Sequence, residues 1–130
     1  MIDFASLVRP RTPNTYLLAP EGLCTVATPD GPAPLFEASA DAVFAAARAE
    51  AEALPRSMDV QADEARHALS FTDRTRLMRF KDDVDVLVVP QGERAAMAVY
   101  SRSRIGKSDL GKNKQRVEAF VAAVRARLAT

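Results

Sequence analysis

The densest group of charged, polar and glycine residues in the chain lies at positions 101–116, between a predicted strand and the last predicted helix. Within it, Gly106 to Lys112 has the G-x4-G-K spacing of a nucleotide-binding phosphate loop. However, Asn113 stands where that loop needs a Ser or Thr hydroxyl for Mg²⁺, and only 17 residues follow it, too few for the parallel strands of that fold. We therefore predict no nucleotide hydrolysis here.

A simpler anion site fits the same residues. Backbone N–H groups at the start of a helix bind anions, and nearby lysine and arginine side chains add positive charge. We predict that this strand-to-helix turn binds an anionic small molecule or an acidic protein surface without catalysing a reaction. The predicted binding residues are Arg102, Ser103, Arg104, Gly106, Lys107, Asp109, Gly111, Asn113 and Arg116. The predicted supporting residues are Asn14, Asp82 and Asp83.

Two other interpretations of the 101–116 stretch stay open. In the first, the protein is an enzyme of unknown reaction that uses Asp83, Asp109 and the arginines, and a pocket with a raised carboxyl pKa would favour it. In the second, the stretch is purely structural, and Arg102, Arg104 and Asp109 tie the turn to residues 13–14 through ion pairs and hydrogen bonds. The residue types alone fit all three interpretations.

The remaining reactive side chains give weaker signals. His67 is the only histidine and falls on the apolar side of a predicted strand, which favours a hydrogen-bonded structural role. Cys24 is the only cysteine, so neither an intrachain disulfide nor a cysteine-based metal site is expected. The three aspartates at 82–85 lack further ligands, and they are predicted either to form a charged strand entry or to pair with Arg102 or Arg104 across the sheet. We expect no metal and no cofactor.

Length and proline content indicate how the chain is organised. At 130 residues, with 48% hydrophobic and 27% charged residues, it is predicted to form one globular domain over residues 1–130. Six of the eight prolines lie at 9–34, which predicts an extended wrapping segment over 1–38, with a short strand at 15–19. An α+β core is then expected over 39–130.

The net charge of +1 conceals an asymmetry. Residues 1–64 carry four basic and ten acidic side chains, whereas residues 102–130 carry eight basic and two acidic ones. The basic end favours an anionic partner, or the two halves attract each other. Nucleic acid is an unfavoured partner, since only Tyr100 offers a stacking surface on the sheet. Without a signal-peptide pattern or an 18-residue apolar run, we predict a soluble cytoplasmic protein with no membrane span.

Two helices follow from apolar residues repeated at helical spacing. The first is expected to begin at the capping residue Ser39 and to end at Pro55. The second is expected to be capped by either Asp109 or Asn113. The predicted buried residues are Val43, Phe44, Ala47, Ala51 and Leu54 in the first helix, and Val117, Phe120, Val121, Val124 and Leu128 in the second.

Period-two patterns predict strands near 58–60 and over 65–72, 84–89 and 95–105, with a type I turn at 89–92. We therefore predict a two-layer α+β fold, in which both helices pack on one face of an antiparallel sheet of about four strands. The opposite face is expected to be open. Its predicted lining residues are Arg66, Ser70, Tyr100, Arg102 and Arg104.

The stretch from Ser101 to Asn113, followed by Arg116, resembles the C-terminal signature of the domain of unknown function family numbered 1499. The signature of that family runs roughly R-S-x-S-R-x-G-x-x-D-L-G-x-N-x-x-R. Pro13-Asn14 and the F-x-D-D-V match at 80–84 agree with the same family, and the resemblance spans about residues 9–128. Because the family has no established activity, the resemblance implies no particular function.

Overall fold

The computed structural model describes residues 1–106 and 110–130 as an α+β fold with two helices and a mixed sheet. Lys107 and Asp109, both predicted binding residues, lie outside the described residues. The elements in chain order are β1 (Thr15–Ala19), β2 (Gly31–Pro32), β3 (Leu35–Phe36), α1 (Ala40–Ala53), β4 (Ser57–Asp63), β5 (Ala68–Arg74), β6 (Lys81–Gln91), β7 (Arg94–Ser103) and α2 (Lys112–Leu128).

The sheet is larger than predicted and is not purely antiparallel. Its strand order is β2-β1-β7-β6-β5-β4, with β3 also paired to β7, and β2 runs parallel to β1. The prediction of about four antiparallel strands is therefore wrong. The additional strands come from the proline-rich N-terminal segment, which satisfies backbone groups of β7 that would otherwise form an unpaired edge.

A long hairpin of β6 and β7 forms the centre of the sheet. Its pairing runs from Asp82 opposite Ser103 to Gln91 opposite Arg94. The loop is thus Gly92 and Glu93, two positions beyond the centre of the predicted turn at 89–92. Gly92 has φ 66°, and glycine at the first loop position is what a type II′ hairpin turn requires.

The first helix agrees with the sequence signals, whereas the start of the second does not. In α1, the Ser39 side chain accepts a hydrogen bond from the Ala42 N–H at 3.1 Å. In α2, the N-cap is Gly111, with φ 81° and no side-chain cap. The predicted cap Asn113 instead lies inside the helix and is fully buried. Neither helix, over the residues described, is long and apolar enough to cross a membrane.

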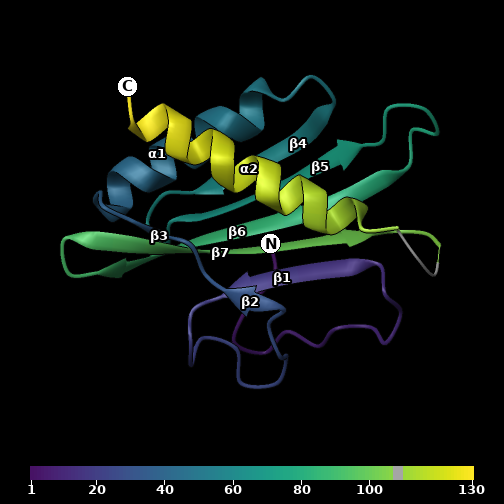
Figure 1. Cartoon of the computed structure of the whole chain (residues 1–130), viewed down its shortest axis with the longest axis horizontal. Coiled ribbons are helices and arrows are strands. Elements are labelled where there is room, and N and C mark those ends of the chain that lie inside the picture. Colours follow the sequence, from purple (N-terminus) through teal and green to yellow (C-terminus); the bar gives the residue numbers. More distant parts are fainter. Residues whose placement is uncertain (107–109) are drawn as a thin grey trace.

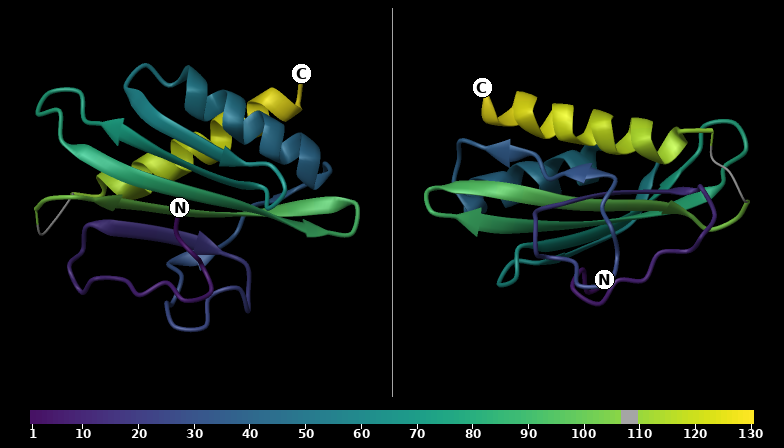
Figure 2. Two further views of the ribbon diagram at one scale, coloured as in Figure 1. Left: turned by 180° about the vertical axis from the view of Figure 1, so that it is seen from behind. Right: turned by 60° about the horizontal axis from the view of Figure 1, so that its bottom comes forward.

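Both helices lie over one face of the sheet (Figures 1 and 2), and their buried side chains share a hydrophobic core with it. The opposite face is only partly open, because the N-terminal segment packs Phe4 against Leu17, Ala98 and Tyr100. Tyr100, predicted to line an open face, is 3% exposed. The apolar N-terminal segment covers it, so the prediction of a fully open face is wrong.

Candidate functional site

The alternation of side chains along β7 separates the signature residues between the two faces of the sheet. Successive residues of a strand point to opposite faces. Ser101 and Ser103 therefore point toward the face that the helices cover, and Arg102 and Arg104 toward the other face. The predicted binding residues accordingly form two polar clusters, on opposite sides of the sheet.

The first cluster, here called the Asn113 network, lies between α2 and the sheet. The Ser101 hydroxyl donates to Asn113 Oδ1 at 2.5 Å. Asn113 Nδ2 donates to the Asn14 carbonyl and to Ser103 Oγ, both at 2.9 Å. Asn14 Nδ2 in turn donates to the Gly106 carbonyl at 2.8 Å. Through these bonds one buried amide joins α2, β7 and the N-terminal segment.

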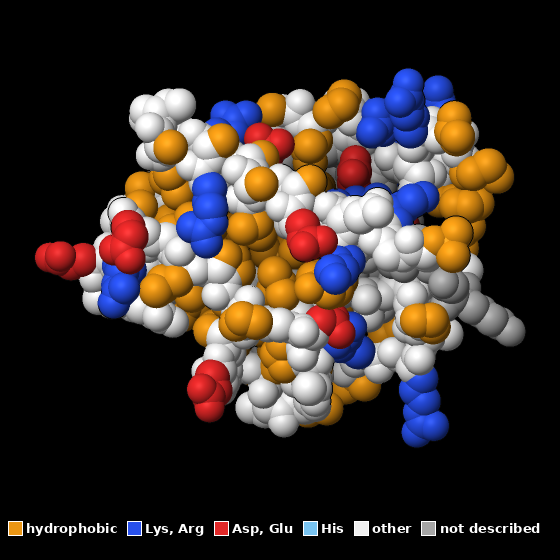
Figure 3. Space-filling model, in the orientation of Figure 1, with side chains coloured by type: hydrophobic (Ala, Val, Ile, Leu, Met, Phe, Trp, Pro, Cys, Tyr) orange, Lys and Arg blue, Asp and Glu red, His pale blue; other side chains and the backbone are white. Residues whose placement is uncertain are grey.

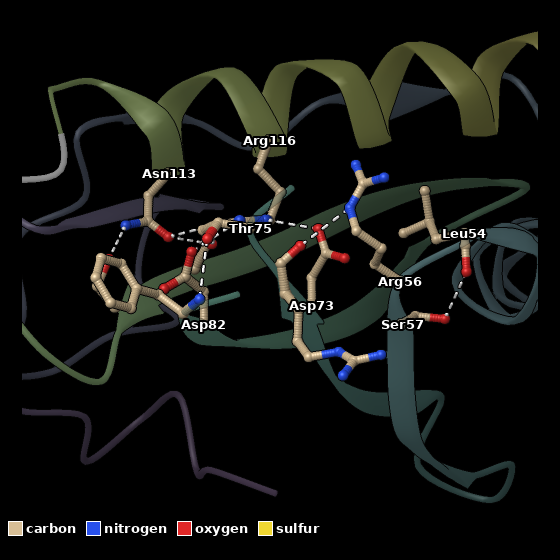
Figure 4. Close-up of polar contacts among 12 residues, drawn as sticks. Leu54, Arg56, Ser57, Asp73, Thr75, Asp82, Asn113 and Arg116 are labelled. Carbon is tan, nitrogen blue, oxygen red and sulfur yellow. Dashed lines mark hydrogen bonds and ion pairs between the residues drawn. The ribbon is translucent and has the colours of Figure 1, made fainter. Parts of the chain in front are cut away.

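Arg116 extends the Asn113 network toward two carboxylates (Figure 4). Its Nε donates to Asp73 Oδ2 at 3.0 Å, and its Nη1 donates to Asn113 Oδ1 at 3.0 Å. Its Nη2 lies 2.8 Å from Oδ2 of the buried Asp82, close enough for an ion pair but out of line for a hydrogen bond. Two carboxylates against one guanidinium give this part of the network a formal charge of −1.

The second cluster, here called the arginine–aspartate pairs, lies on the other face. Arg104 binds Asp83 through two hydrogen bonds of 2.9 Å each. Arg102 Nη1 donates to Asp85 Oδ2 at 2.6 Å, and its guanidinium lies 5.0 Å from the centre of the Tyr100 ring. The four side chains are formally neutral together. The predicted pairing across the sheet is confirmed for Asp83 and Asp85, whereas Asp82 lies against Arg116 on the other face.

Arg104 also sets the protonation of Asp83. Its hydrogen bonds to the carboxylate lower the pKa of Asp83 below the ordinary carboxyl value, against the opposing effect of burial. The Thr72 hydroxyl, which donates to Asp83 Oδ1 at 3.1 Å, lowers this pKa further. Asp83 is therefore a stable carboxylate at neutral pH, which is the opposite of the raised pKa that a general acid needs.

A third arrangement, which we call the cationic groove, was not predicted from the sequence. It is a hollow of about 520 Å³ between residues 9–16 and the start of α2. Arg9 lies in it, bound to Asp30 at 2.7 Å. Arg11 and Lys114 also line it, are exposed, and have no hydrogen-bond or ion-pair partner among residues 1–106 and 110–130.

The cationic groove depends on a contact between distant parts of the chain. Pairing of β1 with β7 brings residues 9–16 beside Gly111 and Lys114. The local sequence signal was present, since Arg9 and Arg11 flank Pro10 just before the Pro13-Asn14 pair. It could not be connected with α2 without knowledge of that strand pairing.

The surroundings of His67 and Cys24 fit a structural role for both side chains. His67 Nε2 lies 2.7 Å from Asp41 Oδ1, and its ring packs edge-on against Phe44. It precedes β5 in a turn, with φ 53°, so its predicted place within a strand is wrong. Burial raises the pKa of the Cys24 thiol. Within the described ranges, no group of three His, Cys, Asp or Glu side chains is placed to hold a metal ion.

Comparison with known proteins gives a family and a distant structural likeness. The model of a family described as protein of unknown function (DUF1499) matches residues 9–124. None of the curated proteins matches the sequence. The crystal structure of the di-domain ARO/CYC BexL from the BE-7585A biosynthetic pathway is similar with a TM-score of 0.47 and 18% identity. The match covers 74% of this chain and 42% of that one, and at this distance it supports no functional inference.

Proposed function

The chain belongs to the DUF1499 family of proteins of unknown function, and we propose that it is a binding domain that holds an anionic small molecule in the cationic groove. One observation carries the proposal. Arg11 and Lys114 face the same hollow from the N-terminal segment and from α2, and neither has a polar partner in the described parts of the chain. Two unpaired cations on one hollow favour an anion there.

The electrostatics of the groove support an anion of modest size. Because Asp30 neutralises Arg9, the groove keeps a formal charge of +2 from Arg11 and Lys114. The first turn of α2 adds the positive end of the helix dipole beside Gly111. A hollow of about 520 Å³ lies within the usual range for small-molecule sites. A small carboxylate or phosphate ester fits these requirements.

The arginines predicted as ligands fit a structural role better. Arg102, Arg104 and Arg116 each already pair with at least one aspartate, so an incoming anion would have to displace a carboxylate. This pairing supports a structural role for the signature. The contacts differ from the predicted ones, because Arg102 and Arg104 pair with aspartates of β6, and it is Asn113 that bonds to Asn14. The enzyme interpretation receives less support, because the pKa of Asp83 is lowered and its charge is balanced by Arg104.

Titration with inorganic phosphate and with citrate, followed by amide NMR shifts, tests the proposal. We expect saturable shifts confined to residues 9–16 and 111–115. The double variant Arg11→Ala/Lys114→Ala should weaken binding about ten-fold or more, since it removes both unpaired cations. The control Arg66→Ala/Arg94→Ala loses the same charge at residues that do not line the groove and should bind within about two-fold of wild type.

Two results would contradict the proposal. The first is that neither anion produces saturable shifts in wild type. The second is that Arg11→Ala/Lys114→Ala binds as tightly as the charge-matched control. Shifts centred on Arg102 and Arg104 instead would place the anion at the signature itself and would likewise exclude the groove.

A further inference from the structure

One end of the molecule exposes large hydrophobic side chains on two loops. In the β5–β6 loop, Leu77 and Met78 are 88% and 67% exposed. In the connection from β7 to α2, Ile105 and Leu110 are 57% and 93% exposed. Hydrophobic side chains gather at this end in the space-filling view, at the right edge of Figure 3. Several water-exposed apolar side chains that lie together indicate an interaction surface.

The two loops are neighbours in space. Both lie at the same end of the sheet in all three ribbon views (Figures 1 and 2). Phe80 from the first loop and Ile105 and Leu110 from the second line one hollow of about 280 Å³. The β5–β6 loop is closed at its base, where the Thr75 N–H donates to the Phe80 carbonyl and the Phe80 N–H to the Thr75 hydroxyl, each at 2.9 Å. Its tip, with Leu77 and Met78, extends beyond that base.

Basic side chains surround these apolar ones. The described residues at 74–81, 104–106 and 110–112 include no Asp or Glu. Their basic residues are Arg74, Arg76, Arg79, Lys81, Arg104 and Lys112. Only Arg104 of these six has an ion-pair partner in the described chain. The sequence at 107–109 adds one lysine and one aspartate, which leave the formal balance unchanged. Asp82 also lines the hollow, but it is buried and paired with Arg116, so the exposed part of this end is both apolar and positively charged.

We propose that residues 74–81, 104–106 and 110–112, here called the docking end, bind the surface of an anionic lipid bilayer. Leu77, Met78, Ile105 and Leu110 insert among the headgroups. The basic side chains that face lipid phosphates are the exposed ones without an ion-pair partner in the described chain, Arg76, Arg79, Lys81 and Lys112. Interfacial segments combine apolar and basic side chains in this way, and anionic lipids attract the basic ones. The interaction is peripheral, and the two cations of the neighbouring cationic groove, Arg11 and Lys114, are not part of the docking end.

A bilayer fits this end better than a protein partner does. The apolar side chains stand at the tips of two loops, where each can enter a fluid interface separately. In one short stretch, Arg76 and Arg79 directly flank the apolar pair Leu77 and Met78. Protein interfaces more often place charge at a rim around a packed apolar centre. Docking at this end would leave the C-terminus and the β6–β7 loop, which lie at the opposite end, facing away from the lipid (Figure 1).

Tryptophan fluorescence gives a direct test, because the chain contains no tryptophan. The variant Leu77→Trp places a single reporter at the docking end, and Val26→Trp places one at an exposed apolar position in the N-terminal segment. With vesicles of 70% phosphatidylcholine and 30% phosphatidylserine, Leu77→Trp emission should shift to the blue and be quenched by brominated acyl chains. Val26→Trp should show neither effect. Equal responses from the two reporters, or none from Leu77→Trp, would overturn the proposal.

Vesicle co-sedimentation tests the same surface without a new aromatic residue. Wild type should partition onto the phosphatidylserine vesicles and not onto pure phosphatidylcholine, and added salt should weaken the partition. The variant Arg76→Gln/Arg79→Gln should partition about ten-fold less. The control Arg66→Gln/Arg94→Gln, with the same charge loss, should match wild type. If wild type partitions onto neither vesicle type, or if the loop variant partitions as strongly as the control, the proposal is overturned. A protein partner would then be the remaining explanation for this end.

Discussion

The Asn113 side chain uses both ends of its amide in the protein interior. Its oxygen accepts from Ser101 and Arg116, and its nitrogen donates to the Asn14 carbonyl and to Ser103. Only a carboxamide of this length offers two donors and an acceptor with two lone pairs at one position. An aspartate there would lose both donors. The buried hydrogen bonds therefore explain why position 113 is an asparagine, and no ligand is needed to account for it.

We expect Asn113→Ala to lower the free energy of unfolding by about 3 kcal/mol, because it leaves several buried polar groups without partners. Urea denaturation measures the change. Gln115→Ala, an exposed neighbour on α2, serves as the control and should change stability by less than about 0.5 kcal/mol. A loss below about 1 kcal/mol for Asn113→Ala would contradict a structural role for the network.

Asp83 should make stability depend on pH in the acid range. Its folded pKa lies below the ordinary carboxyl value, so its contribution is fully present above that value and is lost as pH falls through the folded pKa. In Arg104→Gln the main cause of the lowered pKa is gone while burial remains, so the pKa should rise. A carboxyl NMR titration measures both, with Arg76→Gln as control. An Asp83 that titrates at or above the ordinary value in wild type would contradict this account.

Among the elements, those with local signals were predictable. Ser39 and Pro55 mark the ends of α1, and the apolar spacing marks α2. The long hairpin was also predictable, although its loop is at Gly92 and Glu93 because β6 continues through Pro90. Strands β2 and β3 were not predictable, since two residues each carry no periodic pattern and exist only through their partners.

In the candidate site, too, the features with a local sequence signal were predictable and those that depend on distant strand pairing were not. Period two along β7 correctly places Arg102 and Arg104 on one face and Ser101 and Ser103 on the other. The hairpin register places Asp83 directly opposite Arg102, on the same face as Asp85 and Arg104. The ion pairs that form are the diagonal ones, Arg102 with Asp85 and Arg104 with Asp83. In contrast, the bonds from Asn113 to Asn14 and the cationic groove require pairing between the first strand and the last. No local pattern in the sequence indicates that pairing.

The start of α2 gives a prediction about backbone conformation. Gly111 has φ 81°, and an added Cβ would have no atom within 4 Å, so Gly111→Ala meets no clash and only the strain of a left-handed conformation. We expect a loss of about 1–2 kcal/mol for Gly111→Ala and less for Gly111→Asn, which tolerates this region better. Thermal denaturation measures both, with Lys112→Ala as control. Equal stability of Gly111→Ala and wild type would contradict the assigned conformation.

At the scale of the whole molecule, the acidic region 1–64 and the basic region 102–130 are not held together mainly by ion pairs. Within the described residues, Arg127 with Glu50 is the ion pair that joins residues 102–130 to residues 1–64. The other paired arginines of the C-terminal region bind aspartates at 73–85, in the middle of the chain. Among the described residues, basic side chains without an ion-pair partner then remain at the cationic groove and the docking end, and also singly at Arg56, Arg66 and Arg125. Both proposals rest on this surplus.

The pairing of the first strand with the last also determines the order in which the protein can fold during synthesis. Leu18 in β1 lies opposite Val99 in β7, and the Asn14 carbonyl accepts its hydrogen bond from Asn113, which is synthesised much later. At typical elongation rates β1 is made roughly 4–16 s before its partner exists. Throughout that interval its apolar residues and its backbone edge face water, which invites aggregation. We therefore expect the speed of translation between these two strands to influence the yield of folded protein, although it leaves the stability of the finished fold unchanged.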